Sequence, residues 1–157
     1  MLFTLLVPGA VTLYFPYSIL SRSGGNLQPV SLAFPASVCI LLGLAIYLRC
    51  AWDFAVEGLG TPAPIDPPKI LIVAGLYRWT RNPMYQGVLL ILLAECLLFP
   101  IRGLSVYTAL VALVFHAFVV LYEEPALDAR FGVSYRDYCR KVPRWGFAFR
   151  PFPMDSA

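Results

Sequence analysis

The chain has 157 residues, enough for one domain, and 12 basic against 9 acidic residues give a formal net charge of +3. Apolar residue types make up 59% of it, charged types only 13%, and the mean hydropathy is +0.72. A water-soluble domain of this size cannot bury so much apolar surface, and a disordered chain would be more polar, so the composition predicts a protein embedded in a bilayer. The charge excess is too small to indicate a nucleic-acid partner.

The cysteines, the histidine and the N-terminus argue against a metal site, a disulfide framework and a cleaved signal peptide. Four cysteines without C-x-x-C spacing and a single histidine indicate neither a metal site nor a disulfide framework. The N-terminus is apolar from Met1 and lacks both a basic region and an A-x-A cleavage site. We therefore expect a membrane helix that is retained, not a cleaved signal peptide.

Four apolar stretches predict membrane-spanning helices at residues 2–20, 30–48, 84–99 and 104–122. The third is short and contains Glu95, an intramembrane acid that is either functional or hydrogen-bonded to a neighbouring helix. Residues 1–157 are thus expected to form one all-α domain, a polytopic membrane bundle of about four helices followed by an amphipathic tail. The oligomeric state stays open.

The basic residues are distributed unevenly between the two ends of this bundle. Four lie in the second loop and six in the tail, whereas the first and third loops carry one each, Arg22 and Arg102. By the positive-inside rule the N-terminus, the second loop and the tail are expected to be cytoplasmic.

The second loop ends in a segment that prepares the third helix. After the proline-rich stretch TPAPIDPP comes KILIVAGLYRWTRNPMY, in which Asn82-Pro83 predicts a helix start. The free N–H groups beyond Pro83 could bind an anion. Taken alone, Tyr77, Arg78 and Arg81 are typical of interfacial anchoring, as is Tyr85.

The tail predicts an amphipathic interfacial helix. Its apolar residues recur at spacings of four, four and three, and charged residues lie opposite them. The apolar set is Leu127, Phe131, Tyr135 and Tyr138, and the charged set is Asp128, Arg130, Arg136, Asp137 and Arg140. An aromatic belt is expected to follow, formed by Trp145, Phe147, Phe149 and Phe152.

Glu123 and Glu124 are adjacent carboxylates where the fourth span ends. The C-terminal end of a helix disfavours anions, so the pair is either solvated or faces a positively charged partner. His116 lies seven residues earlier, on the same helical face. It could orient a site there or simply pack with a satisfied hydrogen bond.

Two long motifs together resemble one family. GLYRWTRNPMYQG resembles the G-x-Y-R-x-x-R-H/N-P-x-Y-x-G segment of integral-membrane methyltransferases, and EEPALDARFGVSYRDYCRKVPRWGF resembles their E-E-x-x-L-x-x-x-F-G-x-x-Y-x-x-Y-x-x-x-V-P-R tail. The family joins isoprenylcysteine carboxyl methyltransferases and phospholipid methyltransferases. The resemblance covers residues 69–147. It implies a small helical membrane bundle that binds S-adenosylmethionine at its cytoplasmic end, through segments 69–87 and 123–147, and methylates a lipophilic acceptor.

The resemblance also implies site residues. The cofactor would be held by Lys69, Ile70, Leu71, Ile72, Gly75, Tyr77, Asn82, Pro83, Met84, Tyr85 and Glu123. The catalytic group would comprise Glu123, Glu124 and Arg81. Arg81 and the helix start suit the cofactor carboxylate, the two glutamates suit its ammonium or ribose hydroxyls, and Glu124 is the base available to an amine or thiol acceptor.

Two departures from the family pattern bear on the acceptor. Asn82 replaces the common histidine and cannot titrate. Val119 stands where eukaryotic isoprenylcysteine enzymes carry an arginine that faces the substrate carboxylate. A carboxylate acceptor is therefore disfavoured, while a lipid amine, a thiol or another lipophilic nucleophile stays open. The alternatives to methyl transfer are an NADPH-dependent membrane reductase of the sterol or steroid type and a non-catalytic membrane module of the same fold.

Overall fold

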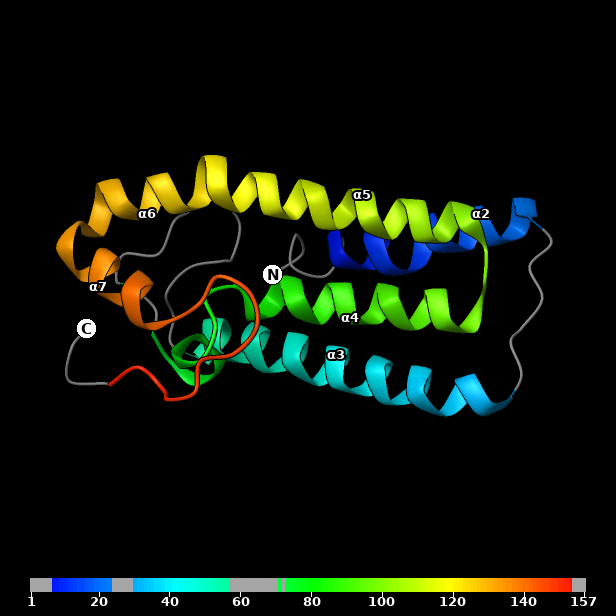
Figure 1. Cartoon of the computed structure of the whole chain (residues 1–157), viewed down its shortest axis with the longest axis horizontal. Helices are drawn as coiled ribbons and strands as arrows, with labels where there is room; N and C mark the ends of the chain where they lie inside the picture. Colours follow the sequence, from blue (N-terminus) through cyan, green and yellow to red (C-terminus); the bar gives the residue numbers. More distant parts are fainter. Residues whose placement is uncertain (1–6, 24–29, 57–70, 72, 154–157) are drawn as a thin grey trace.

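The structure, a computed structural model, describes residues 7–23, 30–56, 71 and 73–153. All regular elements in this part of the chain are helical, and the longer ones run side by side in alternating directions (Figure 1). In chain order they are η1 Ala10–Tyr14, α2 Phe15–Ser23, α3 Val30–Val56, η2 Gly75–Arg78, α4 Pro83–Leu98, α5 Arg102–Phe118, η3 Val119–Glu123, α6 Glu124–Phe131 and α7 Val133–Lys141.

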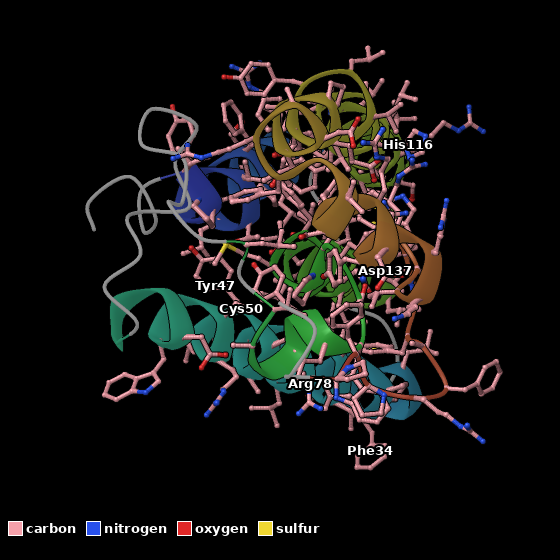
Figure 2. All side chains as sticks on the ribbon, turned by 90° about the vertical axis from the view of Figure 1, so that its left-hand side faces the viewer. Phe34, Tyr47, Cys50, Arg78, His116 and Asp137 are labelled. Atoms are coloured by element: carbon pink, nitrogen blue, oxygen red, sulfur yellow. The ribbon has the colours of Figure 1, made fainter. Side chains whose placement is uncertain are left out.

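In the part of the chain that the structure describes, two helical segments are long and apolar enough to cross a membrane. They are Leu32–Asp53 within α3 and Arg102–Phe131, which runs through α5, η3 and α6. Only 17% and 11% of their most apolar windows are buried inside the bundle, whereas a core helix of a soluble protein is mostly buried. Figure 2 shows Phe34 projecting away from α3, and 77% of its surface is exposed. The remaining apolar surface requires a lipid solvent, so this is a membrane protein.

The expected count of four spans remains a prediction. The 16 residues of α4 extend over about 24 Å, less than the roughly 30 Å of a hydrocarbon core. The boundaries also differ from those expected: α3 continues past residue 48 to Val56, and the last apolar helix continues past residue 122. The start of α4 at Pro83, with Asn82 as its N-cap, is confirmed.

α3 and α4 approach each other closely through two glycines. A Cβ atom at Gly43 would lie 2.6 Å from the Gly87 carbonyl oxygen, and one at Gly87 would lie 2.8 Å from the Gly43 carbonyl oxygen. Beside this contact, Tyr47 packs with Val88 and Leu92 in a buried cluster. Small residues thus let the two backbones touch, which is how membrane helices gain packing energy without a hydrophobic drive.

Gly87→Ala is expected to destabilise the bundle by about 1–3 kcal/mol, because the new methyl group overpacks a backbone contact. Thermal unfolding in detergent would measure this. Gly9→Ala is the matched control, since nothing lies within 4 Å of a Cβ there. Equal melting temperatures for the two variants would contradict the close approach.

The last long helix contains a π-helical turn directly before the tail. Pro125 has no N–H group to donate to the preceding turn. In η3 the helix has the wider π-helical turn, and the Glu124 N–H donates to the carbonyl of Val119. Such turns are frequent at functional sites because they reorient the following side chains. Here the turn carries Glu123 and leads into Glu124.

The tail is not the single helix that its periodicity predicts. Gly132 has φ +53° and separates α6 from α7, and the chain reverses there. The four expected apolar residues nevertheless enter one cluster with Val73 and Val142, because the reversal brings the two short helices together.

After α7 the chain returns across η2. Residues 143–152 form this return, which we name the strap. Ala148 N–H donates to the Trp79 carbonyl at 2.7 Å, and Phe152 N–H donates to the Arg78 carbonyl at 2.9 Å. Phe152 is buried, which corrects its placement in an aromatic belt, whereas Phe149 is fully exposed. The strap brings the tail and the end of the second loop together at one end of the bundle (Figure 1).

Candidate functional site

A pocket lies at this end of the bundle, between the start of α4, the π turn and the tail helices. Its volume is about 80 Å³. Its walls combine two carboxylates, one guanidinium, one amide, three phenols and three aliphatic side chains. These are Glu123, Glu124, Arg81, Asn82, Tyr77, Tyr135, Tyr138, Leu71, Val119 and Leu127.

Glu124 is held by two arginines. Arg144 Nε donates to Glu124 Oε1 and Arg144 Nη2 to Oε2, both at 2.7 Å, which is a bidentate pair. Arg81 Nη1 adds a third hydrogen bond to Oε1 at 2.8 Å. This carboxylate is therefore stabilised as the anion, and its charge is already balanced.

Glu123 has a different environment. Its Oε2 accepts a hydrogen bond from the Tyr85 hydroxyl at 3.2 Å, and the Tyr85 ring lies 4.8 Å from that of Phe115. Among the described residues no cationic side chain pairs with it. Of the two carboxylates, Glu123 is thus the one with which a cationic ligand could pair.

Arg81 is the cation that faces the pocket. Its side chain is 13% exposed, and its Nη1 also contacts Cys139 Sγ at 2.9 Å. Its backbone N–H donates to the Pro143 carbonyl at 3.0 Å. Its Nε is buried without a hydrogen-bond partner among the described residues. Buried donors are normally hydrogen-bonded, so an unpaired one calls for an explanation such as a catalytic role or a bound water or ion.

The phenols beside these charges stay neutral. Burial raises the pKa of Tyr77 and that of Tyr138 well above the usual value of a phenol. The Tyr138 hydroxyl donates to the Tyr77 carbonyl at 2.6 Å, which fixes η2 against α7. Hydrogen bonding to Glu124 raises the pKa of Arg144, so this guanidinium remains charged.

The structure brings six of the predicted site residues to the pocket wall: Leu71, Tyr77, Arg81, Asn82, Glu123 and Glu124. Tyr85 reaches the pocket through its bond to Glu123. Pro83 is buried at the start of α4, and Met84 packs against the cluster around Tyr47. Lys69, Ile70 and Ile72 lie outside the described residues, so their expected role remains a prediction.

Gly75, predicted to bind the cofactor, does not line the pocket. It has φ +52°, and a Cβ there would collide with Oδ2 of the buried Asp53 at the end of α3. This glycine lets η2 sit against α3, and Tyr77 follows two residues later.

Gly75→Ala is expected to lower stability by about 1–2 kcal/mol from the left-handed backbone and by a further 1–3 kcal/mol from the Asp53 collision. Gly146→Ala is a close control, because it has φ +77° and open space around the Cβ. Thermal unfolding should separate the two variants. A loss in Gly75→Ala no larger than that of the control would show that the Asp53 contact is unimportant.

Sequence reasoning missed Arg144 as a site residue, although it is the arginine of the V-P-R ending of the tail motif. Spacing could not reveal that it pairs with Glu124, 20 residues earlier. His116 is exposed and does not line the pocket. It accepts a hydrogen bond at Nδ1 from Trp145 Nε1 at 3.1 Å, which ties the strap to α5.

The fold and the site define a class: a helical membrane protein with a charged pocket where its lipid-facing helices end. A sequence model of the phospholipid methyltransferase family matches residues 33–134. The match covers more than half of the chain, so this protein belongs to the phospholipid methyltransferase family. No curated protein matches the sequence significantly. No solved structure matches it significantly either.

Proposed function

We propose that this protein is an S-adenosylmethionine-dependent methyltransferase whose acceptor is a lipophilic amine. One observation carries the proposal. In a pocket at the end of lipid-facing helices, Glu123 lacks a cationic partner among the described residues, and Arg81 has a buried donor without an acceptor. Together with membership of a methyltransferase family, this pair of vacant interactions suits a ligand with both a cation and a carboxylate.

The polar residues fit the aminoacyl part of this cofactor. Its carboxylate would accept from Arg81 Nε, and Glu123 would attract its positive charge. When bound, the cofactor supplies a methyl group whose carbon–sulfur bond breaks as the bond to the acceptor forms, leaving a neutral thioether.

Glu123 is also the residue that we propose as proton acceptor. An ammonium group must lose a proton before or as its nitrogen is methylated, and the proton needs a carboxylate that is not held by arginine side chains. Sequence reasoning gave this role to Glu124, which instead receives three hydrogen bonds from arginines. Tyr85 holds Glu123 in place for the transfer.

The choice of an amine follows from how the arginines in and beside the pocket are already used. A carboxylate acceptor would need a free arginine, but Val119 occupies the wall of the π turn, and Arg144 is committed to Glu124. The lipid-exposed flanks of α3 and α5 would let a bilayer-dissolved acceptor approach, and the aliphatic wall would keep water from the reacting atoms.

Calorimetric titration of the detergent-purified protein with S-adenosylhomocysteine, and separately with NADPH, tests the proposal. Micromolar binding of the first alone is the expected result. Transfer of a labelled methyl group from S-adenosylmethionine to an aminoethyl lipid in vesicles would then establish the acceptor class. Binding of NADPH alone would indicate a reductase instead. If folded protein bound neither S-adenosylhomocysteine nor NADPH, this would support a non-catalytic module.

A further inference from the structure

We propose that Arg144 is a positioning residue: it holds Glu124 so that Arg81 stays oriented for the cofactor carboxylate. The inference rests on the proposed function and assigns a role to a residue that does not itself line the pocket.

Arg144 forms a bidentate pair with Glu124. Both Glu124 oxygens accept from Arg144 at 2.7 Å, and the Arg144 carbonyl accepts from Asn82 Nδ2 at 3.1 Å. Arg144 is therefore tied by its side chain to α6 and by its backbone to the N-cap residue of α4. It spans the two sides of the pocket.

Its chain neighbours reinforce this placement. The Pro143 carbonyl accepts the Arg81 N–H at 3.0 Å, and Trp145 Nε1 donates to His116 on α5. Three consecutive strap residues thus bond to Arg81, to Glu124 at the start of α6 and to His116 on α5. The strap fixes both the backbone of Arg81 and the carboxylate that its side chain contacts.

The consequence for Arg81 follows from charge. Without Arg144, Glu124 would be an anion with Arg81 as its remaining cationic partner at the pocket wall. Arg81 would then pair with both oxygens of this carboxylate and would no longer be available to bind the cofactor carboxylate. We therefore expect removal of Arg144 to weaken cofactor binding, with little effect on the rate once the site is filled.

The test compares Arg144→Gln with three further variants: Arg144→Lys, the double variant Arg144→Gln with Glu124→Gln, and Arg140→Gln. Arg140 is an exposed arginine on the neighbouring helix α7 and serves as the control. Each protein is titrated with S-adenosylhomocysteine and assayed for methyl transfer at varied S-adenosylmethionine. Circular dichroism and thermal unfolding establish that each is folded.

Arg144→Gln is expected to raise the KM for S-adenosylmethionine and the Kd for S-adenosylhomocysteine by about 10-fold, with kcat within about 3-fold of the wild type. Lysine keeps the charge but cannot form the bidentate pair, so the KM and Kd of Arg144→Lys should lie between those of the wild type and Arg144→Gln. This variant replaces Arg144→Gln in the test if the glutamine variant does not fold. The double variant should bind better than Arg144→Gln, because the competing anion is gone. Arg140→Gln should match the wild type.

Two failures are distinguishable. If the wild type binds no S-adenosylhomocysteine, the proposed function fails and this inference fails with it. If the wild type binds and transfers normally but Arg144→Gln keeps the wild-type KM, loses kcat instead, or is not improved by the second substitution, only the positioning role is overturned.

Discussion

Glu123→Gln is expected to lower the kcat for methyl transfer by at least about 100-fold, within the usual contribution of a general base. Glutamine keeps the size of the side chain and an oxygen that can accept the Tyr85 hydrogen bond, but it removes the charge and the ability to take a proton. Affinity for S-adenosylhomocysteine should fall by roughly 10-fold, because a charge-assisted interaction becomes a neutral one. Labelled methyl transfer and calorimetry would measure the two effects.

Asp137→Asn is the matched control for Glu123→Gln. Asp137 is a half-exposed carboxylate on α7 that pairs with Lys141 at 2.8 Å, away from the pocket wall, and it is labelled in Figure 2. This variant should transfer methyl groups at the wild-type rate. The assignment of Glu123 is refuted if its glutamine variant keeps full kcat, whatever its effect on binding.

Arg81→Met should abolish measurable binding of S-adenosylhomocysteine and also lower the melting temperature. Methionine fills similar space, but the cofactor carboxylate loses its cation, and Glu124 keeps only its pair with Arg144. Removing one partner from a largely buried ion pair costs about 3–5 kcal/mol in other proteins, and the remaining fork to Arg144 should hold the loss below that range. Calorimetry and thermal unfolding in the same detergent provide the two readouts.

Arg22→Met separates the local effect of Arg81→Met from a general loss of charge. Arg22 is exposed in the last turn of α2, at the opposite end of the bundle from the pocket, and its variant should behave as the wild type. If Arg81→Met is folded and still binds S-adenosylhomocysteine with wild-type affinity, the cofactor carboxylate lies elsewhere.

Much of the site could be predicted because its signals are local. Proline disfavours the α region in the residue before it and is well suited to the first turn of a helix, so Asn82-Pro83 marks the start of α4 whatever surrounds it. The order of the two motifs around one helical hairpin likewise predicts that η2 and the tail meet at one end of the bundle. Their hydrogen bonds across Trp79 and Arg78 confirm this meeting.

Other features were beyond a local pattern. The repeated spacing of Leu127 and Tyr135 predicts one helix, yet Gly132 adopts a left-handed conformation, and the chain reverses. A glycine permits such a turn but does not require it. Which of the two adjacent glutamates is neutralised depends on which one pairs with Arg144, and Arg144 comes from the strap.

The sequence by itself determined the solvent, the helical class and the family of this protein. Apolar composition requires a bilayer, backbone groups in lipid must be bonded within helices, and the two motifs are long enough to be specific. Only the tertiary structure decided which charges remain available. Ion pairing depends on distance and burial, and the reversal at Gly132 and the strap bring Arg144 to Glu124 while leaving Glu123 with Tyr85.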